Sequence, residues 1–297
     1  MMIRNAIGPY QLVRLLGRGG MGEVYLGIAH GASGFSRQVA IKLLAPELTV
    51  DPSLEKMLIH EALIGGRIHH RNLVAVLGLG VDEGSYYLVL EYVDGGDLAA
   101  RLHGAPLPEP LALHLAHELA LGLHHLHGVR DDRGLPLGIV HRDVRPANVL
   151  VSTTGDVKLG DLGIAKVTAF MSYTASGTRK GQYRYMAPEQ LAGEPLGAAT
   201  DQFALGVTLV ELLTGHRPYP DGKPWELADL QRAGPDLAGV AEDLRPMILR
   251  ALSIAPADRF ASVDELRHEI VTMQRARPLA GAADVAAWVA HDLRSPG

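Results

Sequence analysis

Ile139 to Val151, reading Ile-Val-His-Arg-Asp-Val-Arg-Pro-Ala-Asn-Val-Leu-Val, is the stretch of sequence that decides the fold. Aliphatic residues at both ends bracket a polar loop, in which the carboxylate of Asp143 stands five residues before the amide of Asn148. Strand-like anchors on both sides are expected to hold these polar side chains in a fixed geometry. Phosphoryl transfer needs such a geometry, because its chemistry is mostly the positioning of a hydroxyl, a metal ion and a phosphate chain.

The composition limits the classes of protein and of binding partner that need to be considered. The 297 residues are 47% hydrophobic and 21% charged, which is typical of a globular protein with room for two modest lobes. A formal net charge of −5 argues against nucleic acid or an anionic membrane as a partner. The absence of cysteine excludes disulfides, thiolate metal sites and cysteine nucleophiles. We find no apolar run long enough for a signal peptide or a membrane segment, and expect a soluble, cytoplasmic protein.

Short apolar runs between Tyr10 and Lys42 predict three antiparallel strands. The first two are joined by a G-x-G-x-x-G pattern, whose glycines are Gly17, Gly19 and Gly22. A dinucleotide-binding loop of this pattern needs a helix after the glycines, whereas Glu-Val-Tyr-Leu follows as a strand. The pattern is therefore either a plain hairpin turn or a loop whose backbone N–H groups approach phosphate oxygens.

Lys42 ends the third apolar run, Val-Ala-Ile-Lys. A lysine in this position is commonly a surface residue, but after a glycine-rich hairpin its ammonium can reach phosphates. Residues 52–69 have the apolar spacing of an amphipathic helix. Glu61 on this helix is the candidate partner of Lys42, and Glu55 is the competing choice.

The middle of the chain reads as a strand, a turn and a long helix. Tyr86 to Val93 is apolar and runs into Asp-Gly-Gly-Asp, a turn that places a lobe boundary near Gly95. Residues 110–128 predict a helix rich in leucine, alanine and histidine. Its histidines raise the question of a metal site, but Glu118 is the single carboxylate among them, and we expect surface or core histidines instead.

Beyond the opening stretch, a short strand ends at Asp161-Leu-Gly, and a polar segment with five Ser or Thr residues covers 164–184. Such a long loop is unusual without a function. It closes at Met-Ala-Pro-Glu189, and a buried helix follows, for which Thr200 is the expected N-cap.

Taken in order from about residue 10 to 270, these motifs resemble those of the protein kinases, most closely the bacterial Ser/Thr kinases. The resemblance implies an α+β, bilobal fold. Residues 10–94 would form an N-lobe of antiparallel strands with one helix, and 95–275 a mostly helical C-lobe. A short tail, 276–297, would follow with a possible helix.

The resemblance also implies ATP and Mg²⁺ as cofactors. Asp143 would orient the substrate hydroxyl and accept its proton beside Arg145, Asn148 and Asp161 would bind the metal ions, and Glu61 would hold Lys42. The apolar side chains that would sandwich the adenine are Leu16, Val24, Ala40 and Leu150. The remaining nucleotide contacts would be the glycine loop, Lys42, the gatekeeper Leu90, the backbone around Glu91 and Val93, the ribose contact Asp97, and Asp161.

In such a fold Asp201, Glu189 and Arg259 would have structural roles, and Arg142 and Thr178 a regulatory one. Asp201 would support the backbone of the loop around Asp143, and Arg259 would pair with Glu189. Arg142, next to Asp143, would bind a phosphate on Thr178 and so switch activity. The expected partners are protein substrates, with a regulatory partner or a dimer as a possibility.

Two departures from the family pattern concern phosphoacceptor choice. Arg145 stands where Ser/Thr kinases usually carry lysine, and Gln182 where they usually carry threonine. The pair can have changed together, because a glutamine carbonyl accepts from a guanidinium. Arginine here also occurs in some tyrosine kinases, while Pro146 favours Ser/Thr. The alternatives are a dual-specificity kinase and a pseudokinase scaffold.

In the tail, Val285, Trp288, Val289 and Leu293 fall on one helical face. The sequence predicts a helix that either packs on its own C-lobe or docks a partner.

Overall fold

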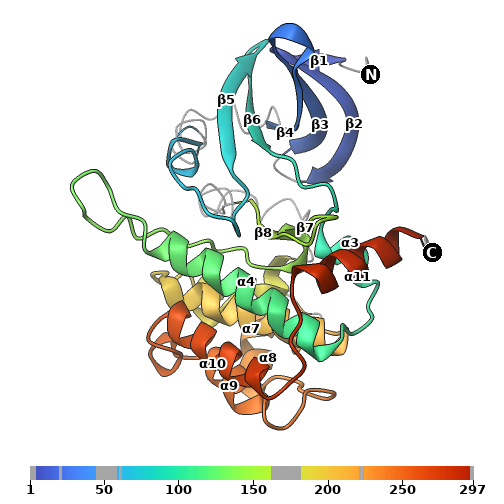
Figure 1. Ribbon diagram of the computed structural model, residues 1–297. Helices are drawn as coiled ribbons and strands as arrows, with labels where there is room; N and C mark the ends of the chain where they lie inside the picture. The colour runs from blue at the N-terminus through green and yellow to red at the C-terminus, as the bar shows by residue number, and fades with distance from the viewer. Residues whose placement is uncertain are drawn as a thin grey trace. The chain divides into compact units, whose positions relative to one another are not determined.

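The computed structural model describes residues 5–19, 22–44, 59, 62–161, 182–220, 222 and 224–294, with the backbone alone for 182, 224 and 292–294. These residues fall into two compact units. The described residues up to 69, with 74–92, belong to the first unit, and residues 70–73, 93–161 and 182–294 to the second. Figure 1 shows a sheet in the first unit and mainly helices in the second.

The first unit is built on a six-stranded antiparallel sheet with strand order β1-β2-β3-β4-β6-β5. Its strands are β1 (Ala6–Ile7), β2 (Tyr10–Gly19), β3 (Gly22–His30), β4 (Ser36–Leu44), β5 (Val76–Asp82) and β6 (Ser85–Glu91). A single 3-10 turn, η1 (Ala32–Gly34), connects β3 to β4. The three strands predicted between Tyr10 and Lys42 are confirmed as β2, β3 and β4. The predicted strand from Tyr86 is β6, which ends at Glu91.

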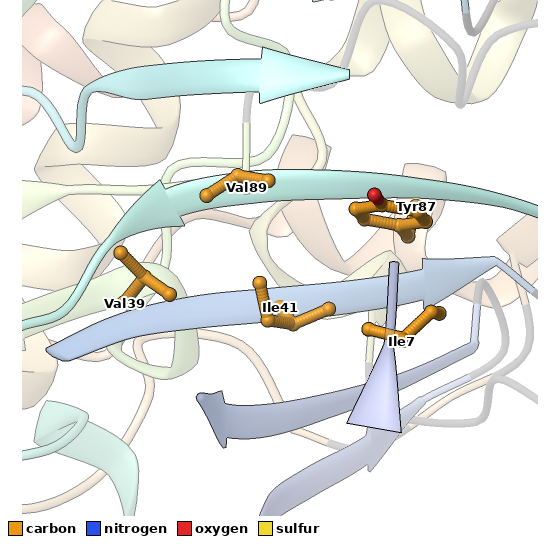
Figure 2. Packing of buried hydrophobic residues seen from close by; sticks show 5 residues of the cluster. All are labelled: Ile7, Val39, Ile41, Tyr87 and Val89. Carbon is orange, nitrogen blue, oxygen red and sulfur yellow. The ribbon is translucent and has the colours of Figure 1, made fainter. Parts of the chain in front are cut away.

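One face of this sheet carries an apolar cluster of Ile7, Val39, Ile41, Tyr87 and Val89, from β1, β4 and β6 (Figure 2). Two glycines leave room for the Tyr87 ring, because a Cβ at Gly8 or at Gly80 would lie 2.2 Å from its atoms. Contacts below about 3 Å are repulsive, so both positions exclude any larger residue. The sequence had not predicted β1, which supplies Ile7 to this core.

The predicted helix over 52–69 lies mostly outside the described residues. Residues 62–65 are helical, and Ala62 is buried. Glu61 and Glu55, the two candidate partners of Lys42, both lie outside the described part.

The second unit contains a β-hairpin and a group of helices. Its elements are α3 (Leu98–Leu102), α4 (Glu109–His127), η2 (Pro146–Asn148), β7 (Val149–Val151), β8 (Val157–Leu159), η4 (Gln182–Tyr185), α6 (Pro188–Ala192), α7 (Ala198–Thr214), α8 (Pro224–Ala233), α9 (Arg245–Ala251), η5 (Pro256–Asp258), α10 (Val263–Arg275) and α11 (Ala282–Arg294). The helix α4 packs against both α7 and α10 (Figure 1). Within the described ranges, no helix is both long and apolar enough to cross a membrane.

The start of α7 differs from the prediction. The helix begins at Ala198 with Gly197 as its N-cap, so Thr200 lies inside the first turn and the prediction for Thr200 was wrong. The Thr200 hydroxyl donates to Oε1 of Glu189 at 2.9 Å. The Thr200 oxygen also accepts from the N–H of Gly197 at 3.4 Å, so Thr200 contributes to the helix start from inside the first turn while its proton goes to a buried carboxylate.

The predicted tail helix is confirmed as α11. Val285 and Val289 have no exposed surface, and Trp288 between them is half-buried. The side chain of Leu293 lies outside the description. Because its apolar face is covered, α11 packs on the second unit, as the first of the two interpretations expected.

Candidate active site

Asp201, in the first turn of α7, fixes the backbone of the polar loop. Its carboxylate is fully buried and accepts hydrogen bonds from the backbone N–H groups of His141 and Arg142, both at 2.8 Å, and from Nε2 of His127 at 2.7 Å. Burial alone would raise the pKa of Asp201, but the hydrogen bonds and the charge of His127 outweigh it and lower that pKa. Asp201 therefore stays ionised and holds the backbone of the loop at His141 and Arg142.

His127 is a site residue that sequence reasoning missed. It was grouped with the other histidines of α4 as a surface or core residue, yet it supplies the side-chain donor to Asp201. Its place as the last residue of α4 was the available signal, because the chain turns there toward the polar loop. A histidine at a helix C-terminus is also favoured by the helix dipole when it is protonated.

The backbone of Arg142 is held from both sides in an uncommon conformation. Its φ of 69° lies in the left-handed region, its N–H donates to Asp201, and its carbonyl accepts from Nε2 of Gln190 at 3.0 Å. Such strain persists where the surroundings over-determine the backbone, and it is typical of functional sites. In the guanidinium, Nε is buried without a hydrogen-bond partner in the described part of the chain. Burial lowers the pKa of Arg142.

Asp143 and Asn148, paired by their spacing in the sequence, are in direct contact. Nδ2 of Asn148 donates at 2.7 Å both to Oδ2 of Asp143 and to its backbone oxygen. The other carboxylate oxygen, Oδ1, accepts from Nε of Arg145 at 3.0 Å. The carboxylate is 4% exposed at the residue level, so these contacts fix its orientation with little competition from water.

His141 connects this loop to Asp161. Its Nε2 is 3.1 Å from the carbonyl oxygen of Gly160, and its Nδ1 accepts from the backbone N–H of Asp143 at 3.4 Å. This pattern fits a neutral imidazole with its proton on Nε2. The N–H of Gly160 donates to the carbonyl of Asn148 at 2.8 Å, across the β7–β8 hairpin. Asp161, with a φ of 60°, therefore follows directly beside Asn148.

The donors at this end of the hairpin fit a magnesium ion. The Asn148 amide nitrogen is committed to Asp143, so the amide oxygen is the atom that can bind a cation. Mg²⁺ prefers oxygen ligands and usually combines one or two protein groups with phosphates and water. No group of three or more His, Asp or Glu side chains within the described ranges is arranged to bind a metal ion. Asn148 and Asp161 therefore suit an ion that arrives with a phosphate ligand.

Glu189 and Arg259, seventy residues apart, form a buried ion pair. Nη1 and Nη2 of Arg259 donate to Oε1 and Oε2 of Glu189 at 2.7 and 2.8 Å. Burial alone would raise the pKa of Glu189, but the bonds and the charge of Arg259 hold it below its usual value. The pair joins α6 to η5, and Gln190 of α6 in turn holds the backbone of Arg142.

Some of the residues expected to bind the nucleotide lie in the first unit and the others in the second. We describe the two groups separately, each within its own unit. In the sheet, β2, β3, β4 and β6 carry Leu16, Gly17, Gly19, Gly22, Val24, Ala40, Lys42, Leu90 and Glu91. Val24 pairs with Lys42, and Ala40 with Leu90, in register. Lys42 is 8% exposed.

In the second unit, Asp97 forms a bridge with Leu150, and Val93 is buried. Asp97 also has a role that the sequence reasoning missed, since its Oδ1 accepts from the N–H of Ala100 at 2.9 Å and caps α3. Three predicted contacts cannot be placed: Glu61 and Thr178 lie outside the described residues, and so does the side chain of Gln182.

Comparisons with known proteins point to one family. The model of the protein kinase domain family matches residues 10–271. The chain is 37% identical over 89% of its length to tyrosine-protein kinase MasK of Myxococcus xanthus, and 36% identical over 98% of its length to Ser/Thr-protein kinase Pkn1 of the same species. It spans 43% of the length of each.

Among solved structures, the kinase domain of Mycobacterium tuberculosis PknI is similar, with a TM-score of 0.69 and 30% identity. The match covers 92% of this chain and all of that one. The α+β fold predicted from the sequence, an antiparallel N-terminal sheet followed by a helical part, is confirmed. On the family match and the shared fold, the chain belongs to the protein kinase family.

Proposed function

We propose that the chain transfers a phosphoryl group from ATP to hydroxyl groups of protein substrates, chiefly those of serine and threonine, in the presence of Mg²⁺. The observation that carries the proposal is the fixed geometry of Asp143. Its two carboxylate oxygens are oriented by Arg145 and Asn148, and its backbone is supported by Asp201 through the neighbouring residues. A carboxylate held in one orientation is suited to act as general base for a hydroxyl placed beside it.

In this mechanism the side chain of Asp143 orients the substrate hydroxyl and takes up its proton. Lys42 would contact the phosphates, while Asn148 and Asp161 would hold the metal ion that accompanies them. When bound, Mg²⁺ neutralises charge on the phosphate oxygens. Arg145 stays beside Asp143 and keeps its carboxylate directed toward the hydroxyl.

Incubation with labelled ATP and Mg²⁺, followed by phosphoamino-acid analysis, tests the proposal. We expect phosphoserine and phosphothreonine, both on the chain itself and on generic protein substrates. Chelation of Mg²⁺ is the control and should abolish the label. Absence of label on every substrate, with ATP still bound, would identify a pseudokinase scaffold instead.

The family leads us to expect a protein substrate, and a regulatory partner or a dimer as a possibility. These expectations rest on the family alone and not on any contact in the described part of the chain. We place the reaction in the cytoplasm, where ATP is available and where a protein without cysteine needs no oxidising environment. Localisation of a tagged protein in fractionated cells tests this placement.

A second phosphoacceptor, tyrosine, is favoured by one contact. Arg145 bonds to Asp143 at the position where arginine occurs in some tyrosine kinases, and the relative MasK carries the name of a tyrosine kinase. Three peptides that differ only in a Ser, Thr or Tyr acceptor separate the alternatives. Comparable kcat/KM on all three would indicate dual specificity.

We expect Arg145 and Gln182 to act together beside Asp143. The single changes Arg145→Lys and Gln182→Thr should each lower kcat/KM on the preferred peptide about tenfold, a loss of about 1.4 kcal/mol of transition-state stabilisation. The double variant should recover most of that loss, because it restores a lysine and threonine pair that fit each other. Additive losses in this double-mutant cycle would show that the two residues are independent.

Activity is expected to be switched by phosphorylation of Thr178. Arg142 supports this proposal. Its backbone N–H is bonded to Asp201, while its buried Nε has no hydrogen-bond partner among the described residues. A phosphate adds about −1.5 to −2 charges and forms charge-assisted hydrogen bonds with a guanidinium. Thr178→Ala and Arg142→Ala should each lower kcat at least about tenfold, and their effects should not add.

Ser176→Ala in the same segment is the matched control and should retain full activity. Mass spectrometry of the protein after incubation with ATP locates the phosphate. Fully active protein with unmodified Thr178 would place the switch elsewhere or remove it.

A further inference from the structure

Arg101, on α3, is a buried cation that no step of the mechanism uses. The residue is 9% exposed. Its Nε donates to the carbonyl oxygen of Gly95 at 2.8 Å, its Nη2 donates to the same oxygen, and its Nη1 lies 3.4 Å from the carbonyl oxygen of Val289. One guanidinium therefore joins two segments that are far apart in sequence, the 93–97 segment and α11.

The segment 93–97, which we call the linker, follows the point where the chain leaves the first unit after Tyr92. Its backbone is fastened to the β7–β8 hairpin. The carbonyl of Gly96 accepts from the N–H of Val151 at 2.9 Å, and Asp94 accepts from the backbone and the hydroxyl of Thr153. A Cβ on Gly95 would lie 2.0 Å from the carbonyl oxygen of Val151, so the two backbones are in close contact there.

The helix α11 contacts this region at two points. Near its start, a Cβ on Gly155, in the β7–β8 turn, would lie 1.9 Å from the carbonyl oxygen of Ala282. Farther along, Val289 reaches Arg101 through its carbonyl and buries its side chain completely. Figure 1 shows α11 next to α3. Because Gly155 and Arg101 hold two points of α11, a shift of the helix would disturb the guanidinium.

A buried guanidinium is stable where its N–H groups find acceptors, since desolvation of an ion costs several kcal/mol. Carbonyl oxygens of the linker and of α11 are among the acceptors of Arg101. If α11 moves away, water reaches the guanidinium and the hold on Gly95 weakens. The position of α11 and the conformation of the linker are thereby energetically coupled.

We propose that Arg101 is a positioning residue which, braced by α11, holds the linker backbone in the conformation that receives the nucleotide. The inference rests on the proposed function, because ATP is taken to pair with the backbone around Val93, two residues before Gly95. It assigns to α11 a control over ATP affinity, in addition to any contribution to stability. The expected readout of this coupling is ATP affinity rather than the rate of transfer.

The first experiment replaces Arg101. Arg101→Met keeps much of the apolar stem and removes the donors, and we expect KM for ATP to rise about tenfold while kcat stays within twofold. Arg101→Lys should recover part of the affinity. Hydrogen exchange should show faster exchange of the linker amides in Arg101→Met. Unchanged ATP affinity together with unchanged linker exchange would overturn the proposal.

The second experiment moves α11 and leaves Arg101 in place. Gly155→Ala puts a methyl group against Ala282, while Gly134→Ala is the matched control: both glycines have a positive φ, 92° and 79°, but a Cβ at Gly134 meets no atom within 4 Å. Gly155→Ala should raise KM for ATP as Arg101→Met does, and Gly134→Ala should not. A lower melting temperature of Gly155→Ala with unchanged ATP affinity would make α11 a purely structural helix and overturn the coupling.

The test of the positioning role of Arg101 can fail or succeed independently of the test of phosphoryl transfer. The Kd of a fluorescent ATP analogue and the linker exchange are measured without phosphoryl transfer. Wild-type protein that binds the analogue but transfers no phosphate refutes the proposed activity and still tests the positioning role. Wild-type protein that binds no nucleotide refutes the positioning role as well.

Discussion

Asp143→Asn is expected to lower kcat by a factor of about 10² to 10⁴, the contribution of a positioned general base. The amide keeps the size of the carboxylate but cannot take up the proton of the substrate hydroxyl. It also turns one acceptor oxygen into a donor, which faces either Arg145 or Asn148, both of them donors to this side chain. The measurement is kcat at saturating ATP, with a thermal melt to show that the variant is folded.

KM for ATP should change little in Asp143→Asn, because the carboxylate contacts the acceptor hydroxyl and not the nucleotide. Lys42→Met is the complementary change, and it should reduce transfer through the loss of a phosphate contact. Asp229→Asn, at a side chain that is 79% exposed, is the matched control and should behave as the wild type. A kcat above about a tenth of the wild-type value for Asp143→Asn would be incompatible with a role as general base.

Asp201→Ala is expected to lower the free energy of unfolding by about 3–5 kcal/mol, the usual cost of removing one partner of a buried charged pair. The change leaves three donors without their acceptor, namely His127 and the N–H groups of His141 and Arg142. Without this support the left-handed backbone of Arg142 should relax and displace Asp143. We therefore expect both stability and kcat to fall, as measured by urea unfolding and by phosphoryl transfer.

Asp229→Ala removes an exposed ion pair with Arg232 and should cost less than about 1 kcal/mol. A loss for Asp201→Ala no greater than this control value would show that the carboxylate does not hold the loop.

The pH dependence of stability gives an independent check on Asp201. Its pKa is lowered in the folded protein, so its stabilising effect is present above the pKa of an unfolded Asp, about 3.9. That effect is lost as the pH falls through the lower, folded pKa, because only the unfolded state binds the proton in between. Between about pH 5 and pH 2, the free energy of unfolding should therefore change less with pH in Asp201→Ala than in the wild type. Urea unfolding at a series of pH values measures this difference.

The sequence by itself determined the elements whose signals are local. Alternation of apolar residues predicted β2, β3 and β4, because side chains of a strand alternate between a buried and an open face. The sequence placed Asp143 and Asn148 five residues apart on one short loop between two anchored strands, and the structure shows the two side chains in contact there. The apolar face of the tail predicted α11 from helical periodicity alone.

Only the tertiary structure decided which side chains meet across long stretches of chain. His127 and Asp201 are 74 residues apart, and Arg101 and Val289 are 188 apart. The place of His127 at the end of α4 is a local feature, but its partner Asp201 is not, and nothing in the local pattern assigns Arg101 to a buried position. Thr200 has the residue type of an N-cap, yet it lies inside the first turn of α7 and its hydroxyl donates to Glu189. The physical reason is the same in each case: a buried polar group must find a partner where water is excluded, and packing alone decides which partner is within reach.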